Sequence, residues 1–151
     1  MPTLQFDSIP AALAPLDLLL EADPSIEQVQ KYLSDGDIYT VLSDGKTVGV
    51  CVLQPRSDGT FELMNIAVDP SHQANGIGRQ LLQFVIAQSK KKQAKSLVLG
   101  TGTFGYQLAF YQREGFRVVG IEKDFFLDNY NEPVIENGIQ HKDMLRLELT
   151  L

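Results

Sequence analysis

A short glycine-bearing stretch at residues 73–78, Gln-Ala-Asn-Gly-Ile-Gly, joins two segments of different character. Residues 61–68 before it resemble a strand, whereas residues 77–92 repeat apolar side chains at the spacing of one helix face. The first turn of a helix leaves backbone N–H groups without partners and carries about half a positive charge. Because Gly76 and Gly78 have no Cβ, a phosphate can approach that backbone closely. The stretch therefore predicts an anion site at the start of a helix.

The 151-residue chain has the composition of one globular domain spanning residues 1–151, with 44% apolar and 21% charged residues. No apolar run approaches the roughly 20 residues that a membrane helix needs, and residues 1–7 lack the basic and apolar regions of a secretory signal. The one cysteine, Cys51, has no partner for an internal disulfide, which agrees with a reducing compartment. We therefore expect a cytoplasmic protein.

Acidic residues outnumber basic ones by 19 to 13, which gives a net charge of −6. This balance argues against nucleic-acid and anionic-membrane partners and favours a cationic small molecule, although modest acidity also serves solubility alone. His72 and His141 lie far apart in the sequence, and with one cysteine they offer no metal-ligand spacing. We expect no metal site.

The first half of the chain predicts a short strand, two helices and an antiparallel meander of three strands, at residues 3–6, 9–23, 24–34, 38–42, 47–53 and 60–68. Pro15 either begins the first helix proper or kinks it. The Asp44-Gly45 pair is typical of the turn of a β-hairpin. Three strands joined in sequence by tight turns form a meander, so we expect this part of the sheet to be antiparallel.

The second half predicts a helix, a short strand, a glycine-rich loop, a helix, a strand and a closing strand, at residues 77–92, 96–99, 100–105, 106–113, 116–121 and 144–151. The short strand follows a helical crossover, so it should run parallel to the strand that ends at Val68. Residues 123–142 show no regular pattern apart from a turn at Asn137-Gly138. The predicted fold class is mixed α/β (α+β), with a largely antiparallel sheet flanked by helices.

The glycines at 100–105 also match the dinucleotide fingerprint Gly-x-Gly-x-x-Gly, with Glu122 about 20 residues further on. A dinucleotide fold pairs two βαβαβ halves in a mostly parallel sheet, whereas the strands before this loop are joined by hairpins. The context therefore disfavours a nicotinamide dinucleotide enzyme.

Three motifs stand around the first glycine stretch: Asn-Ile-Ala-Val-Asp-Pro at 65–70, Gln-x-x-Gly-x-Gly at 73–78, and Ala-Phe-Tyr-Gln-Arg-Glu-Gly-Phe at 109–116. Together they resemble the GNAT superfamily of acetyl-CoA-dependent N-acetyltransferases. The resemblance covers about residues 47–121. It implies a mixed, mostly antiparallel central sheet of about six or seven strands, in which a splayed strand pair binds acetyl-CoA.

The resemblance also implies how acetyl-CoA binds. Its pyrophosphate would lie on backbone N–H groups of the 73–78 stretch, where Arg79 either adds a contact or is only solvated. Its pantetheine arm would pair like an added strand with the backbone of Ile66 and Val68, whose side chains we expect in the core. Thr103 stands near a position where many members carry an asparagine that touches the cofactor. The implied cofactor-binding residues are Ile66, Ala67, Val68, Gln73, Ala74, Asn75, Gly76, Ile77, Gly78, Arg79, Thr103 and Tyr111.

Two side chains carry the catalytic roles that the resemblance implies. Tyr111 aligns with a tyrosine that acts as general acid on the leaving thiolate, or it only packs on a helix face. Glu62 aligns with a carboxylate that serves some members as general base, or it is a solvent-facing strand residue. A backbone N–H at or near Val68 would meet the carbonyl oxygen.

The resemblance does not choose the acetyl acceptor. Residues 124–136 combine acidic and aromatic side chains, a composition that can hold an amine but also suits a solvated acidic loop. We expect this segment and the helices at 9–34 to wall an acceptor pocket, with contacts from Asp124, Phe126, Asp128 and Tyr130.

The function expected is N-acetylation of a primary amine of a small, cationic molecule by direct attack in a ternary complex with acetyl-CoA. The alternatives are a coenzyme A-binding regulatory module without turnover and a peptide or protein amine acetyltransferase. The chain could also form a homodimer.

Overall fold

The computed structural model describes residues 3–73 and 75–151. Within these residues, seven strands form a central sheet in the order β1-β2-β3-β4-β5-β9-β6, and β7 pairs with β8 in a separate ribbon. β5 runs parallel to β4, and the other neighbours in the large sheet are antiparallel. The strands are β1 (Leu4–Ile9), β2 (Asp37–Ser43), β3 (Lys46–Pro55), β4 (Thr60–Val68), β5 (Ser96–Gly102), β6 (Arg117–Glu122), β7 (Ile135–Glu136), β8 (Ile139–Gln140) and β9 (Met144–Thr150). The predicted mixed, mostly antiparallel sheet is confirmed.

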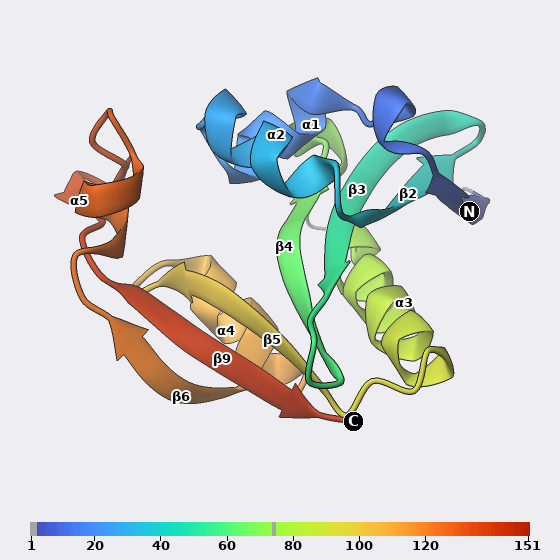
Figure 1. Ribbon diagram of the computed structural model, residues 1–151. Coiled ribbons are helices and arrows are strands. Elements are labelled where there is room, and N and C mark those ends of the chain that lie inside the picture. Colours follow the sequence, from blue (N-terminus) through green and yellow to red (C-terminus); the bar gives the residue numbers. More distant parts are fainter. Residues whose placement is uncertain (1–2, 74) are drawn as a thin grey trace.

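The helices flank two arms of this sheet, which separate at one end (Figure 1). One arm holds β1–β4 with α1, α2 and α3, and the other holds β5, β9 and β6 with α4 and α5. The closing strand β9 lies between β5 and β6, so the last residues of the chain join the second arm. The helical elements are η1 (Ala11–Leu13), α1 (Leu16–Ala22), α2 (Ile26–Leu33), η2 (Pro70–His72), α3 (Ile77–Lys91), α4 (Tyr106–Arg113) and α5 (Phe125–Asn129).

Local sequence signals set where the first helices begin. Pro15 is the residue before α1 and its carbonyl accepts the first helical hydrogen bonds, so it begins the helix and does not kink it. The Ser25 hydroxyl accepts a hydrogen bond of 3.2 Å from the Gln28 N–H and so caps α2. β1 continues to Ile9, past the predicted end at residue 6, because each of its residues pairs with β2.

A β-bulge in β4 marks the point at which the arms separate. Neighbouring residues of β3, Val52 and Leu53, pair with Asn65 and Leu63, which leaves Met64 as an extra residue on β4. On its other side β4 pairs with β5 only over its first three residues. Because a bulge bends its strand, the rest of β4 leaves β5 and its edge faces a gap.

Two clusters of buried apolar side chains, within the described residues, lie on the two faces of β4. The larger one packs α3, through residues such as Leu81 and Val85, against the sheet, and Ile66 and Val68 lie at its margin. The other packs α1 and α2 against Ala67 and its neighbours. β4 is therefore held from both sides while one of its edges stays open.

The prediction of a glycine-rich loop at residues 100–105 is wrong for its first half, because β5 continues to Gly102. A Cβ on Gly100 would lie 2.2 Å from Met144 Sδ, and one on Gly102 would lie 2.3 Å from His141 Cε1. Glu122, the acidic residue of the dinucleotide fingerprint, is an ion-pair partner of an arginine in β9. These glycines make room for side chains and not for a dinucleotide.

Residues 123–142, expected to be irregular, form α5 and the β7–β8 hairpin. Asn137 and Gly138 have φ values of 52° and 78°, the positive pair that a tight type I′ hairpin turn requires. The His141 N–H donates a hydrogen bond of 2.7 Å to the Val134 carbonyl and closes the hairpin. Strands of two residues carry no periodicity, so only the turn was predictable. None of the helices in the described ranges has the length and apolar character needed to cross a membrane.

Candidate active site

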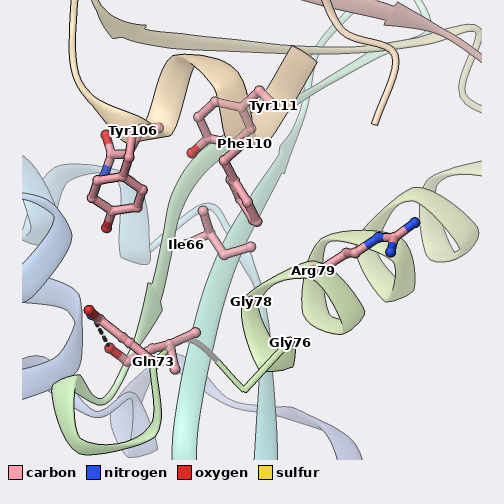
Figure 2. Close-up of a pocket in the computed structure, with 10 residues that line it drawn as sticks. Ile66, Gln73, Gly76, Gly78, Arg79, Tyr106, Phe110 and Tyr111 are labelled. Atoms are coloured by element: carbon pink, nitrogen blue, oxygen red, sulfur yellow. Dashed lines mark hydrogen bonds between the residues drawn. The ribbon is translucent and has the colours of Figure 1, made fainter. Parts of the chain in front are cut away.

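A cavity of about 490 Å³ lies beside the open edge of β4. Figure 2 shows Ile66 of β4 between the first turn of α3 and the aromatic side chains of α4. The lining residues come from β4, from the start of α3 and from α4: Ile66, Val68, Gln73, Gly76, Gly78, Arg79, Tyr106, Gln107, Phe110 and Tyr111. The first glycine stretch and the Tyr111 helix, distant in sequence, thus meet at one cavity.

The turn before α3 has the geometry of a helix-start anion site. Gly76 is the residue before the helix and has a φ of 78°, a left-handed conformation that glycine adopts without strain. The N–H groups of the first helical turn have no intrahelical acceptor, so they are free for a ligand. Ile77 is buried in the core, which leaves only its backbone for binding, and Asn75 is exposed. Ala74, also expected to bind the cofactor, lies outside the described residues.

Beyond the bulge, alternate residues of β4 face the cavity and the opposite core. Ile66 and Val68 line the cavity and are partly buried, whereas Ala67 is buried against α1 and α2. The side chains of Ile66 and Val68 thus pack against the larger core cluster, as expected, and also face the cavity. Their edge of β4 is the one that β5 leaves unpaired, so backbone polar groups there can accept a ligand.

Three more residues were expected to contact the cofactor, and their side chains lie in three different surroundings. Gln73 Nε2 donates a hydrogen bond of 3.1 Å to the Val68 carbonyl and ties the glycine turn to the end of β4. Arg79 lines the cavity, but its Nε donates to Glu114 Oε1 at 3.1 Å and its side chain is 71% exposed. Thr103 is exposed and belongs to the lining of neither cavity described here.

Tyr111 is buried among aromatic side chains at the wall of the cavity. Its ring packs edge-on against Phe110 and Phe116, with centroids 5.2 Å and 5.9 Å away. Burial, with a smaller contribution from nearby Tyr106, raises the pKa of the Tyr111 hydroxyl far above its usual value. The hydroxyl is therefore protonated at neutral pH and can act as a proton donor.

A second cavity of about 400 Å³ adjoins the first and shares four lining residues with it, Ile66, Tyr106, Gln107 and Tyr111. Its other walls are residues 20–24 at the end of α1, residues 63–65 of β4, the end of β5, and side chains from the segment that holds α5 and the β7–β8 hairpin. The acidic side chains of its lining are Glu21, Asp23 and Glu136.

The four residues expected to contact an acceptor divide into two pairs. Phe126 and Tyr130 line the second cavity, whereas Asp124 and Asp128 do not. The Asp124 N–H donates to Asp143 Oδ1 at 2.8 Å at the start of α5, and Asp128 is exposed. Phe126 and Tyr130 therefore face the cavity, and these two acidic residues do not.

Asp23 joins the two sides of the second cavity through a chain of hydrogen bonds. The Tyr130 hydroxyl donates to Asp23 Oδ1 at 2.9 Å, and the Tyr32 hydroxyl donates to Oδ2 at 3.0 Å. Asn65 Nδ2 donates in turn to the Tyr32 oxygen at 2.9 Å. Burial raises the pKa of both tyrosine hydroxyls, so they remain donors at neutral pH.

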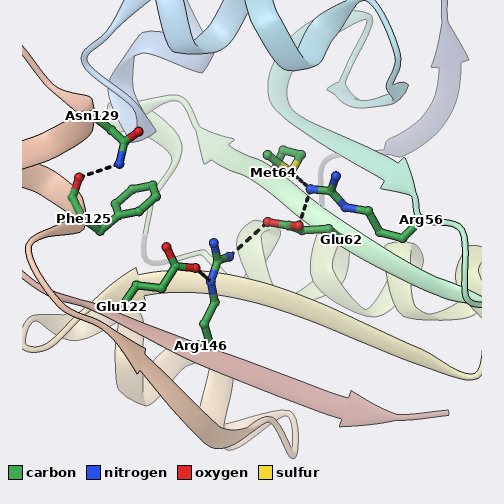
Figure 3. Close-up of polar contacts among 7 residues, drawn as sticks. All are labelled: Arg56, Glu62, Met64, Glu122, Phe125, Asn129 and Arg146. Atoms are coloured by element: carbon green, nitrogen blue, oxygen red, sulfur yellow. Dashed lines mark hydrogen bonds and ion pairs between the residues drawn. The ribbon is translucent and has the colours of Figure 1, made fainter.

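Glu62 lies outside both cavities, in the part of β4 that still pairs with β5. Figure 3 shows its carboxylate between Arg56, which donates to Oε1, and Arg146, which donates to Oε2 at 3.2 Å; Arg146 also pairs with Glu122 at 2.5 Å. A carboxylate held by two guanidinium groups is poorly placed to take a proton from a substrate. We therefore assign Glu62 to an ion-pair network across the sheet and not to proton transfer.

Several cavity residues were not identified from the sequence. On α4, the pairs Tyr106 with Phe110 and Gln107 with Tyr111 are each four residues apart, a spacing that places them on one face and could have been used. Asp23 and Glu136 fall within the two segments expected to wall an acceptor pocket, but no spacing singled them out, and His141 lies outside both segments. Their positions depend on the tertiary structure alone.

Comparison with known proteins gives consistent results. The sequence model described as the acetyltransferase (GNAT) domain matches residues 34–118. The uncharacterized N-acetyltransferase YvbK of Bacillus subtilis is 46% identical over 136 residues, which cover 89% of this chain and 88% of that protein.

Two solved structures have nearly the same fold. A GNAT family acetyltransferase from Elizabethkingia anophelis with acetyl-CoA bound has a TM-score of 0.94, 44% identity and 98% coverage of both chains. An IAA acetyltransferase from Bacillus cereus has a TM-score of 0.95 and 40% identity, and the match covers 99% of this chain and 100% of that one. The splayed arms, the glycine turn on α3 and these relatives agree, and the chain belongs to the GNAT family of acetyltransferases.

Proposed function

We propose that this acetyltransferase transfers the acetyl group of acetyl-CoA to the primary amine of a small, cationic molecule, by direct attack in a ternary complex. The observation that carries the proposal is the junction of the two cavities at Ile66 and Tyr111, with carboxylates lining the second one. A donor in the first cavity and an amine in the second would meet beside the Tyr111 hydroxyl.

Acetyl-CoA, when bound, supplies a thioester carbonyl that an amine can attack. The first cavity suits it because the α3 turn at Gly76 offers backbone N–H groups and the positive end of a helix dipole to a pyrophosphate. The unpaired edge of β4 at Ile66 and Val68 offers backbone groups to an amide-bearing arm. The acetyl-CoA bound by the Elizabethkingia relative supports the same donor for this chain.

Tyr111 donates a proton to the leaving thiolate, a role supported by its place in both linings and by the raised pKa of its hydroxyl. A backbone N–H at or near Val68 stabilises the negative charge that develops on the carbonyl oxygen. Its position on the unpaired edge of β4 supports this role, because no neighbouring strand uses that edge in the described residues.

The acceptor's positive charge is met by the second cavity. Glu21, Asp23 and Glu136 attract an ammonium, and the rings of Phe126 and Tyr130 add cation–π attraction. The volume of about 400 Å³ lies in the range of small-molecule sites. The net charge of −6 favours the approach of cations over anions.

The proposal is tested by incubating the enzyme and acetyl-CoA with a panel of diamines, amino sugars, neutral amines and peptides with free N-termini. Thiol release and the mass of the acetylated product are measured. We expect the highest kcat/KM with small cationic amines. A preference for peptides would favour the peptide amine acetyltransferase, and acetyl-CoA binding without turnover across the panel would favour the regulatory module.

A matched pair of variants tests the acceptor site. Asp23→Asn removes a charge from the second cavity and should raise the acceptor KM by roughly tenfold, the loss of one partly exposed charge-assisted contact. Asp128→Asn removes the same charge from an exposed position outside the cavity and should leave the KM unchanged. Equal KM values for the two variants would contradict the assignment.

A further inference from the structure

A histidine–carboxylate pair lies in the second cavity, and none of the proton transfers described above uses it. His141 Nε2 is 2.9 Å from Glu136 Oε1, and the two residues flank the turn of the β7–β8 hairpin. The His141 side chain is 7% exposed, whereas that of Glu136 is 33% exposed. One member of the pair is thus fixed in the protein, and the other is open to the cavity.

The imidazole of His141 packs against two aromatic rings and a glycine. Phe104 stacks on it with a centroid distance of 4.1 Å and an interplanar angle of 7°, and the Phe126 ring lies 5.3 Å away. Gly102 lies against the ring, where a Cβ would come within 2.3 Å of Cε1. Any side chain at position 102 would therefore displace the imidazole.

A second glycine makes room for the carboxylate. A Cβ on Gly105 would lie 2.6 Å from Glu136 Oε2 and 3.0 Å from Oε1. Gly105 is the residue before α4, so the carboxylate lies at the N-terminal end of that helix, where a negative charge is favoured. Tyr111 is on the same helix, about 9 Å further along its axis, and helical side chains lean toward the N-terminus. The carboxylate and the proposed acid therefore line the same cavity, the carboxylate at the start of α4 and Tyr111 on the helix itself.

The hydrogen-bond pattern assigns the proton on His141. An ionised carboxylate only accepts, so Nε2 carries the hydrogen and donates it to Glu136. Nδ1 is buried and has no hydrogen-bond partner among residues 3–73 and 75–151. The imidazole is therefore held to the carboxylate through Nε2 alone, and this hydrogen bond orients Glu136.

The other carboxylates are less well placed. Both oxygens of Asp23 already accept hydrogen bonds, from Tyr130 and Tyr32. Glu62 is held by two arginines outside the cavity. Glu136 accepts from His141 through Oε1, and in the described part of the chain no donor occupies Oε2. One oxygen of Glu136 is therefore open to a substrate.

We propose that Glu136 is the general base of the acceptor site and that His141 is its positioning residue, an inference that rests on the proposed function. The carboxylate takes one proton from the acceptor ammonium, and the freed lone pair forms the C–N bond as the C–S bond breaks. Tyr111 gives its proton to the departing sulfur and regains one from the same nitrogen. Glu136 releases its proton to solvent through its exposed part, so that one proton is set free for each amide formed.

The test uses the best acceptor of the panel and a fluorinated analogue whose ammonium is more acidic. A base is needed most by the strongly basic amine, so Glu136→Gln should lower its kcat by roughly 10²–10⁴-fold. The loss for the fluorinated amine should be at least about tenfold smaller, because more of that amine is already neutral. Glu132→Gln, at an exposed position of the same segment, is the matched control and should leave both rates unchanged.

Two variants of the positioning residue separate its hydrogen bond from its packing. His141→Phe keeps the ring that stacks on Phe104 but removes the donor, and it should lower kcat mainly for the basic amine. His141→Gln keeps an N–H donor near the Nε2 position and should retain more of the activity than His141→Phe. Melting curves establish that each variant is folded.

The role of Glu136 would be overturned if Glu136→Gln changed only KM, or if it lowered kcat equally for the two amines. Equal activity of the two folded His141 variants would overturn the role of His141. Failure of the wild-type enzyme to acetylate any amine would instead overturn the proposed function, so the two failures are distinguishable.

Discussion

The Tyr111 hydroxyl acts in surroundings that the rest of the chain creates for it. Burial disfavours the charged phenolate, so the hydroxyl keeps its proton at any pH near neutrality. A thiolate that departs beside it can take that proton while the acceptor nitrogen gives one back to the Tyr111 oxygen, so that no phenolate has to persist in the apolar surroundings. The same burial that makes Tyr111 look like a core residue thus keeps it in the protonated form that a proton donor needs.

Tyr111→Phe removes the proton donor and keeps the ring. We expect kcat to fall by roughly 10²-fold or more, the usual contribution of a positioned acid, while the acetyl-CoA Kd changes little. Steady-state kinetics and calorimetric titration measure the two quantities. An unchanged kcat would remove the role assigned to Tyr111.

Glu62→Gln provides the contrasting measurement at a carboxylate outside the cavities. It weakens the ion pairs with Arg56 and Arg146, so we expect a lower melting temperature with kcat within about threefold of wild type. A large fall in kcat with an unchanged melting temperature would restore Glu62 as the base.

At the scale of elements, glycines decide what the helix starts can bind. At α3 the glycines Gly76 and Gly78 line the cavity without side chains, and Gly76 adopts the left-handed conformation that opens the helix. At α4, two glycines stand on either side of the β5–α4 connection. The space beside Gly102 is occupied by the His141 side chain, and the space beside Gly105 by the Glu136 side chain. The first helix start remains open to an anion, whereas the second is occupied by the protein's own carboxylate.

Gly78→Ala tests the open helix start. Its Cβ would lie 3.6 Å from Val68 and 3.7 Å from Phe110, ordinary contacts, and alanine favours a helix by up to about 1 kcal/mol over glycine. We expect an equal or higher melting temperature together with a roughly tenfold higher Kd for acetyl-CoA, because the methyl group narrows the cavity beside the backbone N–H groups of the first turn of α3.

Gly120→Ala on β6 is the control. Its Cβ would lie 4.0 Å from Arg146 Cβ, and we expect the acetyl-CoA Kd to be unchanged. Tight acetyl-CoA binding by the Gly78→Ala variant would show that the ligand avoids this turn.

The whole molecule depends on the separation of its two arms. The bulge at Met64 turns β4 away from β5 and opens one strand edge, while the Arg146 network and the β4–β5 pairing keep the arms joined below it. The chain of hydrogen bonds from Tyr130 through Asp23 to Tyr32 joins them again across the second cavity. The buried tyrosines therefore contribute to stability as well as to the site.

Alkaline unfolding tests that contribution. The pKa values of Tyr32, Tyr111 and Tyr130 are raised above their unfolded value of about 10, chiefly by burial. Their stabilising contribution is complete below pH 10 and is lost as the pH rises above it, because the unfolded chain then releases protons that the folded one keeps.

Chemical denaturation at a series of pH values should show the free energy of unfolding falling above pH 10. Tyr111→Phe should reduce that slope by about 1.4 kcal/mol per pH unit, the effect of one proton. Tyr106→Phe, at an exposed tyrosine, should leave the slope unchanged.

The sequence by itself determined most of the elements, the parallel crossover to β5, the glycine turn before α3 and the family. These are local features, since periodicity, Asp-Gly turns and short motifs act over a few neighbouring residues. Only the tertiary structure decided that Glu62 belongs to an ion-pair network and that Glu136 and His141 enter the second cavity. The reason is physical: a bulge, a tight hairpin and two glycines bring together residues far apart in the chain, and no local pattern records which distant side chain will fill the space that a glycine leaves.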